Sequence, residues 1–110
     1  MKGLLRASLV LAVTLGLALP VLAGDAGAGA EAYKANKCSM CHQIAGQGGK
    51  MGGALDDVGS KRDAEWLKKY IKDPKSVEPG AKMKAYPSIA DKDLDDLVAY
   101  LLTLKAEPKK

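Results

Sequence analysis

The chain has 110 residues, which is enough for one small domain and too few for a second. Apolar residues make up 47% of it and charged residues 27%, a balance that excludes an intrinsically disordered protein. The formal net charge of +4 suggests an anionic partner, but it counts every residue that processing would remove.

The N-terminal segment has the order of a cleaved secretory signal peptide. Two basic residues are followed by an uncharged apolar stretch over residues 7–19, by the helix breaker Pro20 and by Ala23. This order predicts a signal peptide over residues 1–23, cleavage after Ala23 and a periplasmic protein. An uncleaved membrane anchor over residues 7–23 is the other interpretation, because its 17 residues lie at the lower edge of what spans a bilayer.

Cleavage after Ala23 would leave a chain with a small apolar core. Of its 87 residues 36 are apolar and thirteen of those are alanine, so that 23 larger apolar side chains remain. Domains of this size commonly need a disulfide, a metal or a cofactor to stay folded. We therefore expect a further group to fill the interior.

The amino-acid composition predicts the secondary structure of the first part of the mature chain. Residues 24–29 alternate glycine and alanine around one aspartate, which predicts a flexible leader. Helix formers then recur and predict a first helix from about Ala28 to Cys41. Five of the eight residues 46–53 are glycine, so we expect an irregular loop whose backbone approaches its neighbours closely.

Two amphipathic helices are predicted further along. Asp63 can cap a helix over residues 64–72, which ends before Pro74. An extended loop over residues 75–87 follows, and the last helix covers residues 91–105. The apolar faces are Trp66, Leu67, Tyr70 and Ile71 in the first helix and Leu94, Leu97, Val98, Leu101 and Leu102 in the second.

The predicted fold class is all-α. No segment alternates polar and apolar residues as a half-buried strand does. We expect one domain over residues 30–105 and a disordered tail over residues 106–110.

Both cysteines and the only histidine lie together in Cys38-Ser39-Met40-Cys41-His42. This C-x-x-C-H spacing is typical of covalent c-type haem attachment. Each thiol can form a thioether with one vinyl group of the porphyrin, and the adjacent imidazole becomes the proximal ligand of the iron. A porphyrin held in this way would also supply the apolar volume that the chain lacks.

Three other interpretations of the two cysteines remain open. A disulfide between Cys38 and Cys41 would close a short loop and leave His42 unexplained. A zinc site needs about four ligands and would have to recruit carboxylates. A thioredoxin-type redox pair expects surrounding strands that the sequence does not predict.

The sixth position of a haem iron is open to methionine, lysine, water or no ligand, because the chain has no second histidine. Met40 lies within the attachment motif and cannot reach the opposite face. Met51 lies in the glycine-rich loop, where a methionine commonly fills a gap. Met83 stands between two lysines with no evident packing role, so we favour it as the ligand.

The mature sequence resembles the small bacterial class I c-type cytochromes over essentially its whole length. The resemblance implies crossed first and last helices, with three to five helices around one covalent haem c ligated by His42 and Met83. It also implies an electron carrier that is not an enzyme. The matching segments are residues 38–42, 59–62, Trp66-Leu67, 70–74, 83–86 and 94–101.

The resemblance assigns roles to further residues. Tyr33 and Tyr100 would meet where the terminal helices cross, and Gly29 would permit the close approach. Trp66 or Tyr70 would line the haem. Plain core packing is an equally good interpretation of each aromatic residue.

One segment departs from the family pattern. Such cytochromes often have a Gly-Pro pair followed closely by leucine after the motif, where a carbonyl accepts the Nδ1–H of the histidine. Here residues 52–55 are Gly-Gly-Ala-Leu. A carbonyl of this stretch can still accept from His42, and the sequence does not decide which one.

The resemblance implies a monomer with redox partners such as a cytochrome-reducing complex and a terminal oxidase or reductase. Nucleic acid is not expected as a partner, and contact with a membrane surface would be transient at most. Two other functions stay open: a haem subunit of a membrane oxidoreductase, and a haem enzyme or gas sensor in which Met83 is displaced. Lysines 37, 50, 82 and 84 are candidates for a basic docking collar, and ordinary solvated lysines explain the same pattern.

Overall fold

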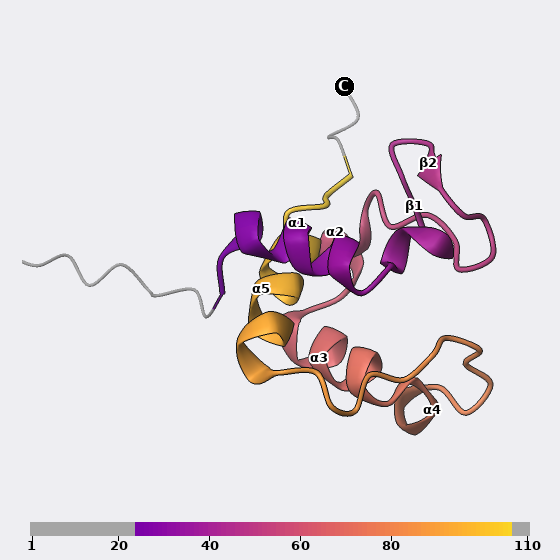
Figure 1. The fold of residues 1–110 in the computed structure, drawn as a ribbon. Coiled ribbons are helices and arrows are strands. Elements are labelled where there is room, and N and C mark those ends of the chain that lie inside the picture. The colour runs from indigo at the N-terminus through magenta and orange to yellow at the C-terminus, as the bar shows by residue number, and fades with distance from the viewer. Residues whose placement is uncertain (1–23, 107–110) are drawn as a thin grey trace, which may run out of the picture.

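Helices α1 (Ala26–Ala35) and α5 (Asp91–Leu102) cross each other in the computed structural model, which describes residues 24–106 (Figure 1). Helix α3 (Ala64–Lys72) packs against α5. The predicted helical class is confirmed, with one two-stranded antiparallel hairpin added. The shorter elements of these residues are the 3₁₀ turn η1 (Cys38–Met40), strands β1 (Gln43–Ile44) and β2 (Gln47–Gly48), and helices α2 (Val58–Lys61) and α4 (Pro74–Val77).

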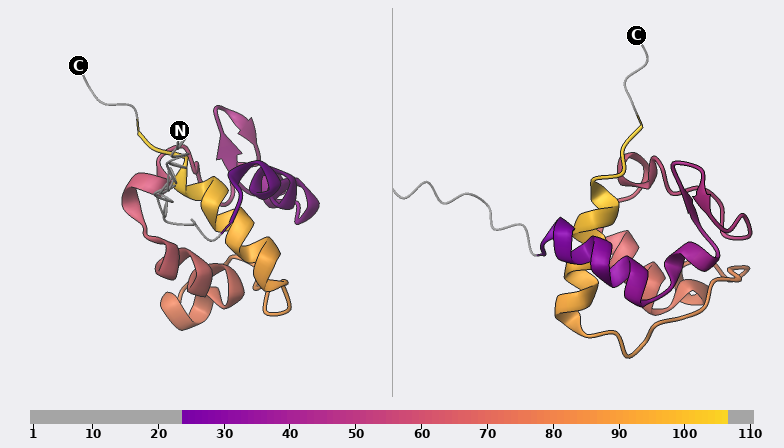
Figure 2. Two further views of the ribbon diagram at one scale, coloured as in Figure 1. Left: turned by 90° about the vertical axis from the view of Figure 1, so that its left-hand side faces the viewer. Right: turned by 45° about the horizontal axis from the view of Figure 1, so that its top comes forward.

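Gly29 lets the backbones of α1 and α5 come into contact at the point where the two helices cross (Figure 2). A β-carbon at Gly29 would overlap the carbonyl oxygen of Asp96 and would lie 2.6 Å from Cβ of Tyr100. The rings of Tyr33 and Tyr100 meet edge to face at the same crossing, with centroids 5.7 Å apart. The predicted meeting of the two tyrosines, with Gly29 permitting the approach, is confirmed.

The predicted flexible leader over residues 24–29 is wrong, because most of this segment is the first turn of α1. Asp25 caps the helix, and its carboxylate accepts from the Gly27 amide at 2.9 Å. The Asp25 amide donates to the Asp96 carboxylate at 2.9 Å, and Lys92 Nζ donates to the same carboxylate at 2.7 Å. The Lys92 ammonium and the Asp25 amide hold the pKa of the buried Asp96 carboxyl below its usual value.

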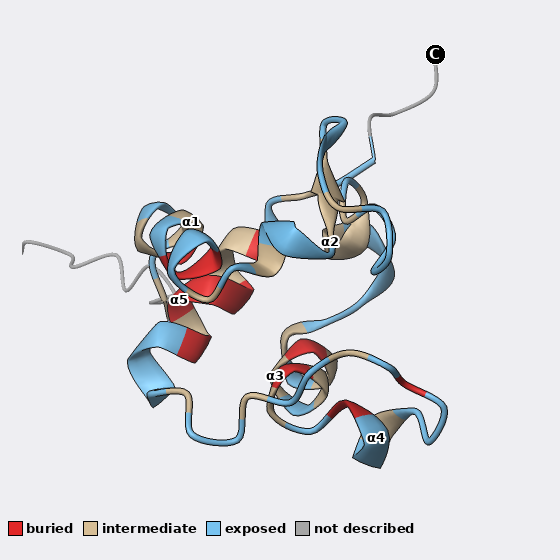
Figure 3. Ribbon diagram, turned by 45° about the vertical axis from the view of Figure 1, so that its right-hand side comes forward, coloured by how far each residue is buried: buried red, intermediate tan, exposed pale blue. Residues whose placement is uncertain are grey.

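The buried side chains gather where α1 and α3 each pack against α5 (Figure 3). On α3, Leu67 and Ile71 are buried, whereas Trp66 and Tyr70 of the same predicted face are half-buried. The core residues are Ala32, Tyr33, Leu67, Ile71, Leu94, Leu97, Val98 and Leu101.

The first helix was predicted to continue to about Cys41. Helix α1 instead ends at Ala35. The side-chain amide of Asn36 donates to the Ala32 carbonyl at 2.8 Å, and Lys37 takes a left-handed φ of 56°. The 3₁₀ turn η1 follows directly, so the cysteine motif lies off the axis of α1.

Four other features differ from the prediction. The loop predicted over residues 46–53 contains strand β2, and the loop predicted over residues 75–87 begins within helix α4. Helix α2 was not predicted, because four residues are too few for a periodic pattern. Helix α5 ends at Leu102 and not at Lys105, since the Thr103 hydroxyl donates to a carbonyl of the last turn at 2.6 Å.

The ends of the chain are described only in part. The predicted signal peptide, residues 1–23, lies outside the described residues, as do residues 107–110 of the predicted tail. Ala106 is described, and its amide donates to the Ser60 hydroxyl at 3.2 Å. Residue 30, where the domain was predicted to start, lies inside α1.

Replacing Gly29 by alanine is expected to lower the free energy of unfolding by about 3 kcal/mol, because the methyl group would overlap backbone that cannot yield. Guanidinium denaturation measures this loss. Gly27→Ala is the matched control in the same helix, since its β-carbon would meet only the Asp25 carboxylate at 3.4 Å, and it should leave stability equal or slightly higher. Equal stability of the two variants would contradict a close crossing at Gly29.

Candidate cofactor site

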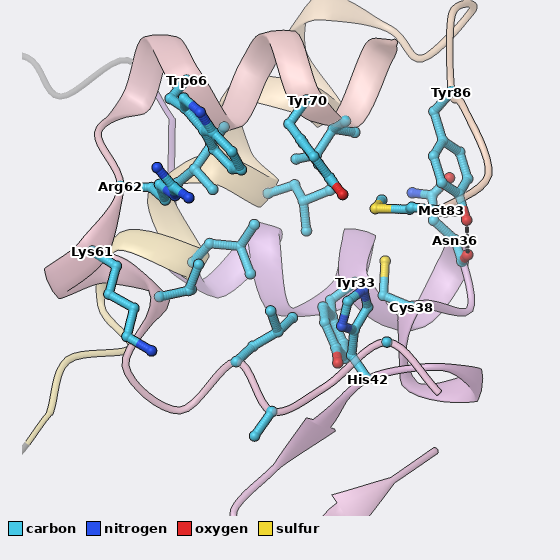
Figure 4. Close-up of a pocket in the computed structure, with 18 of the residues that line it drawn as sticks. Tyr33, Asn36, Cys38, His42, Lys61, Arg62, Trp66, Tyr70, Met83 and Tyr86 are labelled. Atoms are coloured by element: carbon cyan, nitrogen blue, oxygen red, sulfur yellow. Dashed lines mark hydrogen bonds between the residues drawn. The ribbon is translucent and has the colours of Figure 1, made fainter. Parts of the chain in front are cut away.

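A cleft opens between helix α3, helix α5 and the loop after the cysteine motif (Figure 4). It holds about 960 Å³ of space that no protein atom fills, its open mouth included. Its walls are mostly apolar and include Leu55, Val58, Leu67, Ile71, Leu97 and Leu101. The small core inferred from the composition therefore corresponds to an open space inside the fold.

The turn η1 presents part of the cysteine motif to this cleft. Cys38 and His42 line the cleft, and the His42 amide donates to the Cys38 carbonyl at 3.0 Å, which places the two residues one turn apart. Cys41 is exposed, and both cysteines are free thiols. Burial raises the pKa of the Cys38 thiol. Within residues 24–106 no three His, Cys, Asp or Glu side chains are grouped in a way that could hold a metal ion.

The imidazole of His42 is held by the glycine-rich loop. Its Nδ1 lies 3.2 Å from the carbonyl oxygen of Gly53 and, because a carbonyl only accepts, Nδ1 carries the proton. Nε2 then keeps its lone pair for a metal. A β-carbon at Gly52 would lie 2.8 Å from Nδ1, so the loop packs directly on the ring. The acceptor that the sequence left open is therefore the carbonyl of Gly53.

Met83 also lines the cleft, and its thioether points into the cleft from the side opposite His42 (Figure 4). It belongs to the loop between α4 and α5 and is half-buried. Met40 and Met51 are 69% and 93% exposed, and neither lines the cleft. Among the described methionines the structure therefore brings Met83 together with Cys38 and His42.

Aromatic side chains of α3 cover another part of the cleft. The rings of Trp66 and Tyr70 stack with centroids 4.7 Å apart, and the guanidinium of Arg62 lies 4.1 Å from the Trp66 ring centroid. Arg62 also pairs with Glu78 at 3.9 Å. The sequence did not single out Arg62 as a lining residue, because Arg62 lies before α3 in extended backbone and no helical spacing relates it to Trp66.

Tyr33 provides an independent sign that a group belongs in the cleft. Its hydroxyl is buried and has no hydrogen-bond partner among the described residues. Burial raises the pKa of Tyr33 to about 12, so this hydroxyl stays protonated. An unsatisfied buried hydroxyl costs about 1–3 kcal/mol, which a bound group could offset. One thiol, one imidazole and one thioether line the cleft, and the second thiol, Cys41, lies next to His42 in the chain, so the residues suit a covalently attached haem.

Several known proteins are similar to this chain in sequence or in fold. The family model described as Cytochrome c matches residues 26–105. Cytochrome c-554 of Methylosinus trichosporium is 32% identical over 96% of this chain and 93% of its own length. Cytochrome c oxidase subunit 2 of Alkalihalophilus pseudofirmus is 33% identical over 73% of this chain, which spans only 26% of that protein. The structure of cytochrome c2 from Rhodobacter sphaeroides matches with a TM-score of 0.52 at 27% identity, over 77% of this chain and 99% of that one.

The fold and these matches define the class of protein as a small class I c-type cytochrome. The chain belongs to the cytochrome c family. It is a haem-binding electron-transport protein, and its family implies a covalently bound haem c. The predicted family and fold are confirmed.

Replacing Gly52 by alanine should disturb the His42 imidazole, because the new methyl group would press on the ring at 2.7–2.8 Å. The hydrogen bond to the Gly53 carbonyl would weaken, and we expect the ring Nδ1–H to exchange with solvent about tenfold faster. Proton NMR of the haem-loaded protein measures this exchange. Gly80→Ala is the control, since its β-carbon would meet nothing within 4 Å. Unchanged exchange in Gly52→Ala would show that this loop does not hold the ring.

Proposed function

We propose that this cytochrome is a periplasmic carrier of single electrons, with its haem attached through Cys38 and Cys41 and ligated by His42 and Met83. One observation carries the proposal: His42 and Met83 reach the same cleft from separate segments of the chain, with Cys38 beside them (Figure 4). The haem iron, when bound, supplies a one-electron redox couple.

The protein residues around the cleft would orient His42 and Met83 toward a bound haem. The Gly53 carbonyl fixes the tautomer of His42 so that Nε2 is presented to the metal. A thioether such as that of Met83 favours the reduced state of a haem. Two protein ligands would leave no coordination position for a substrate, which supports a carrier over a haem enzyme or a gas sensor.

Export to the periplasm is proposed from the N-terminal sequence. Residues 1–23 have the order of a signal peptide with cleavage after Ala23. Among residues 24–106, no helix is long and apolar enough to cross a membrane. Cleavage at this point would leave Gly24 first and would retain the cap of α1 at Asp25.

The proposed partners are redox proteins, such as a cytochrome-reducing complex and a terminal oxidase or reductase. Lysines 37, 50, 82 and 84 are exposed, and none forms an ion pair with another residue of the described part. Unpaired positive charge beside the motif and the Met83 loop supports brief docking on acidic surfaces. The similarity to an oxidase subunit 2 supports a second candidate function, that of a haem subunit in a membrane oxidoreductase.

A haemochrome spectrum together with an intact mass tests the proposal on protein matured in a periplasm. We expect the spectrum of a haem with both vinyl groups consumed, and the mass of residues 24–110 plus one haem. Recovery in the soluble periplasmic extract favours the carrier, whereas recovery with membranes after signal removal favours the oxidoreductase subunit. Purified protein without covalent haem would overturn both.

Met83→Ala should abolish the Met-to-iron charge-transfer absorption of the oxidised protein, because the proposed sulfur ligand is removed. Absorption spectroscopy of the purified oxidised variant measures the band. Met51→Ala is the matched control, since Met51 is 93% exposed and lies outside the cleft, and the band should persist in it. A band that survives in Met83→Ala would exclude Met83 as the ligand.

A further inference from the structure

The loop that carries Met83 has few fixed points of its own. Between helices α4 and α5 the chain forms neither helix nor strand, and Met83 itself is followed by the exposed residues Lys84 and Ala85. Apart from the bonds of Glu78 and Ala90 to the adjoining turns of α4 and α5, two hydrogen bonds join this loop to other elements of the described chain, and Tyr86 donates both. The Tyr86 amide donates to the Ile71 carbonyl of α3 at 3.0 Å, and its hydroxyl donates to the Asn36 carbonyl at 3.1 Å (Figure 4).

We infer that Tyr86 is a positioning residue whose hydroxyl holds the Met83 loop closed against the segment that carries the haem-attaching motif. The hydrogen bond lies at one edge of the cleft, which both residues line (Figure 4). It joins the two segments that carry the proposed ligands, because Asn36 lies two residues before Cys38 and Tyr86 three residues after Met83. Three residues extend at most about 10 Å, so fixing Tyr86 restricts where the Met83 sulfur can go. This inference rests on the proposed ligation by Met83.

The acceptor of this hydrogen bond is itself rigid and available. Asn36 is the C-cap of α1, and the last carbonyls of a helix have no partner within it. Both the backbone amide and the side-chain amide of Asn36 donate to the Ala32 carbonyl, at 3.0 and 2.8 Å. The hydroxyl of Tyr86 therefore satisfies a free carbonyl on a residue that is already fixed to the core.

The ring of Tyr86 contributes to the same arrangement. It is half-buried and packs against the core, and the Lys84 ammonium lies 5.7 Å from its centroid. A phenylalanine at this position would keep the ring and the backbone hydrogen bond to Ile71 and would lose only the hydroxyl. Tyr86→Phe therefore isolates the contact with Asn36.

Binding of free imidazole to the oxidised, haem-loaded protein tests the inference, because an added ligand can bind only when Met83 has left. If the hydroxyl holds the loop closed, Tyr86→Phe should bind imidazole about three- to tenfold more tightly while it keeps the Met-to-iron band without imidazole. Tyr100→Phe is the control, because it removes a hydroxyl from the α1–α5 crossing and should bind imidazole as the native protein does. Equal affinity in native protein and Tyr86→Phe would overturn the inference.

Hydrogen exchange measured by mass spectrometry separates a local tether from a general loss of stability. In Tyr86→Phe we expect faster exchange in a peptide over residues 82–89 and unchanged exchange in α5. If exchange became equally faster in residues 82–89 and in α5, Tyr86 would stabilise the whole fold, and the inference of a local tether would be wrong. A native protein without the Met-to-iron band would refute ligation by Met83, while the exchange experiment would still report whether the hydroxyl holds the loop.

Discussion

The backbone contact between α1 and α5 at Gly29 determines where the haem-attaching motif lies. At the start of α1 the Asp25 amide donates to the Asp96 carboxylate of α5. At its end the Asn36 side chain caps the helix by donating to the Ala32 carbonyl. The motif begins two residues later, so its position relative to α5 is fixed by a helix held at both ends. Because α5 also supplies part of the apolar wall, this one crossing sets the width of the cleft between the cysteines and that wall.

The sequence predicts those parts of the fold that depend on residues close together in the chain, and it fails where contacts with distant segments decide the structure. Asp63 starts α3 as predicted, because a cap acts on amides two or three residues away. The repeat of apolar residues in α5 likewise lies within one helix. Residues 24–29 were misread because their glycines look flexible in isolation, whereas Gly29 is small in order to fit against α5. The end of α1 was misplaced because helix formers continue past Asn36, where side-chain capping stops the helix.

The candidate site likewise has residues that the sequence predicts and contacts that it does not. The cysteine motif is contiguous, so its chemistry could be read from the sequence, and the placement of Met83 in a late loop agreed with its position in the cleft. The carbonyl that accepts from His42 could not be predicted, because four candidates were equivalent until the loop folded. The contact between Tyr86 and Asn36 joins residues fifty positions apart, and no local pattern encodes it.

The folded structure shows which charged side chains are paired and which are not. Two of the aspartates of α5 are neutralised by lysines: Asp95 pairs with Lys68 at 3.0 Å, and Asp96 pairs with Lys92 at 2.7 Å. The acidic end of α5 is therefore partly compensated, and its remaining aspartates face the positive end of the helix dipole. The lysines beside the motif and the Met83 loop have no such compensation among the described residues. Because paired charges largely cancel at a distance, these unpaired lysines contribute more to the field around the protein than the paired lysines of α3 and α5 do.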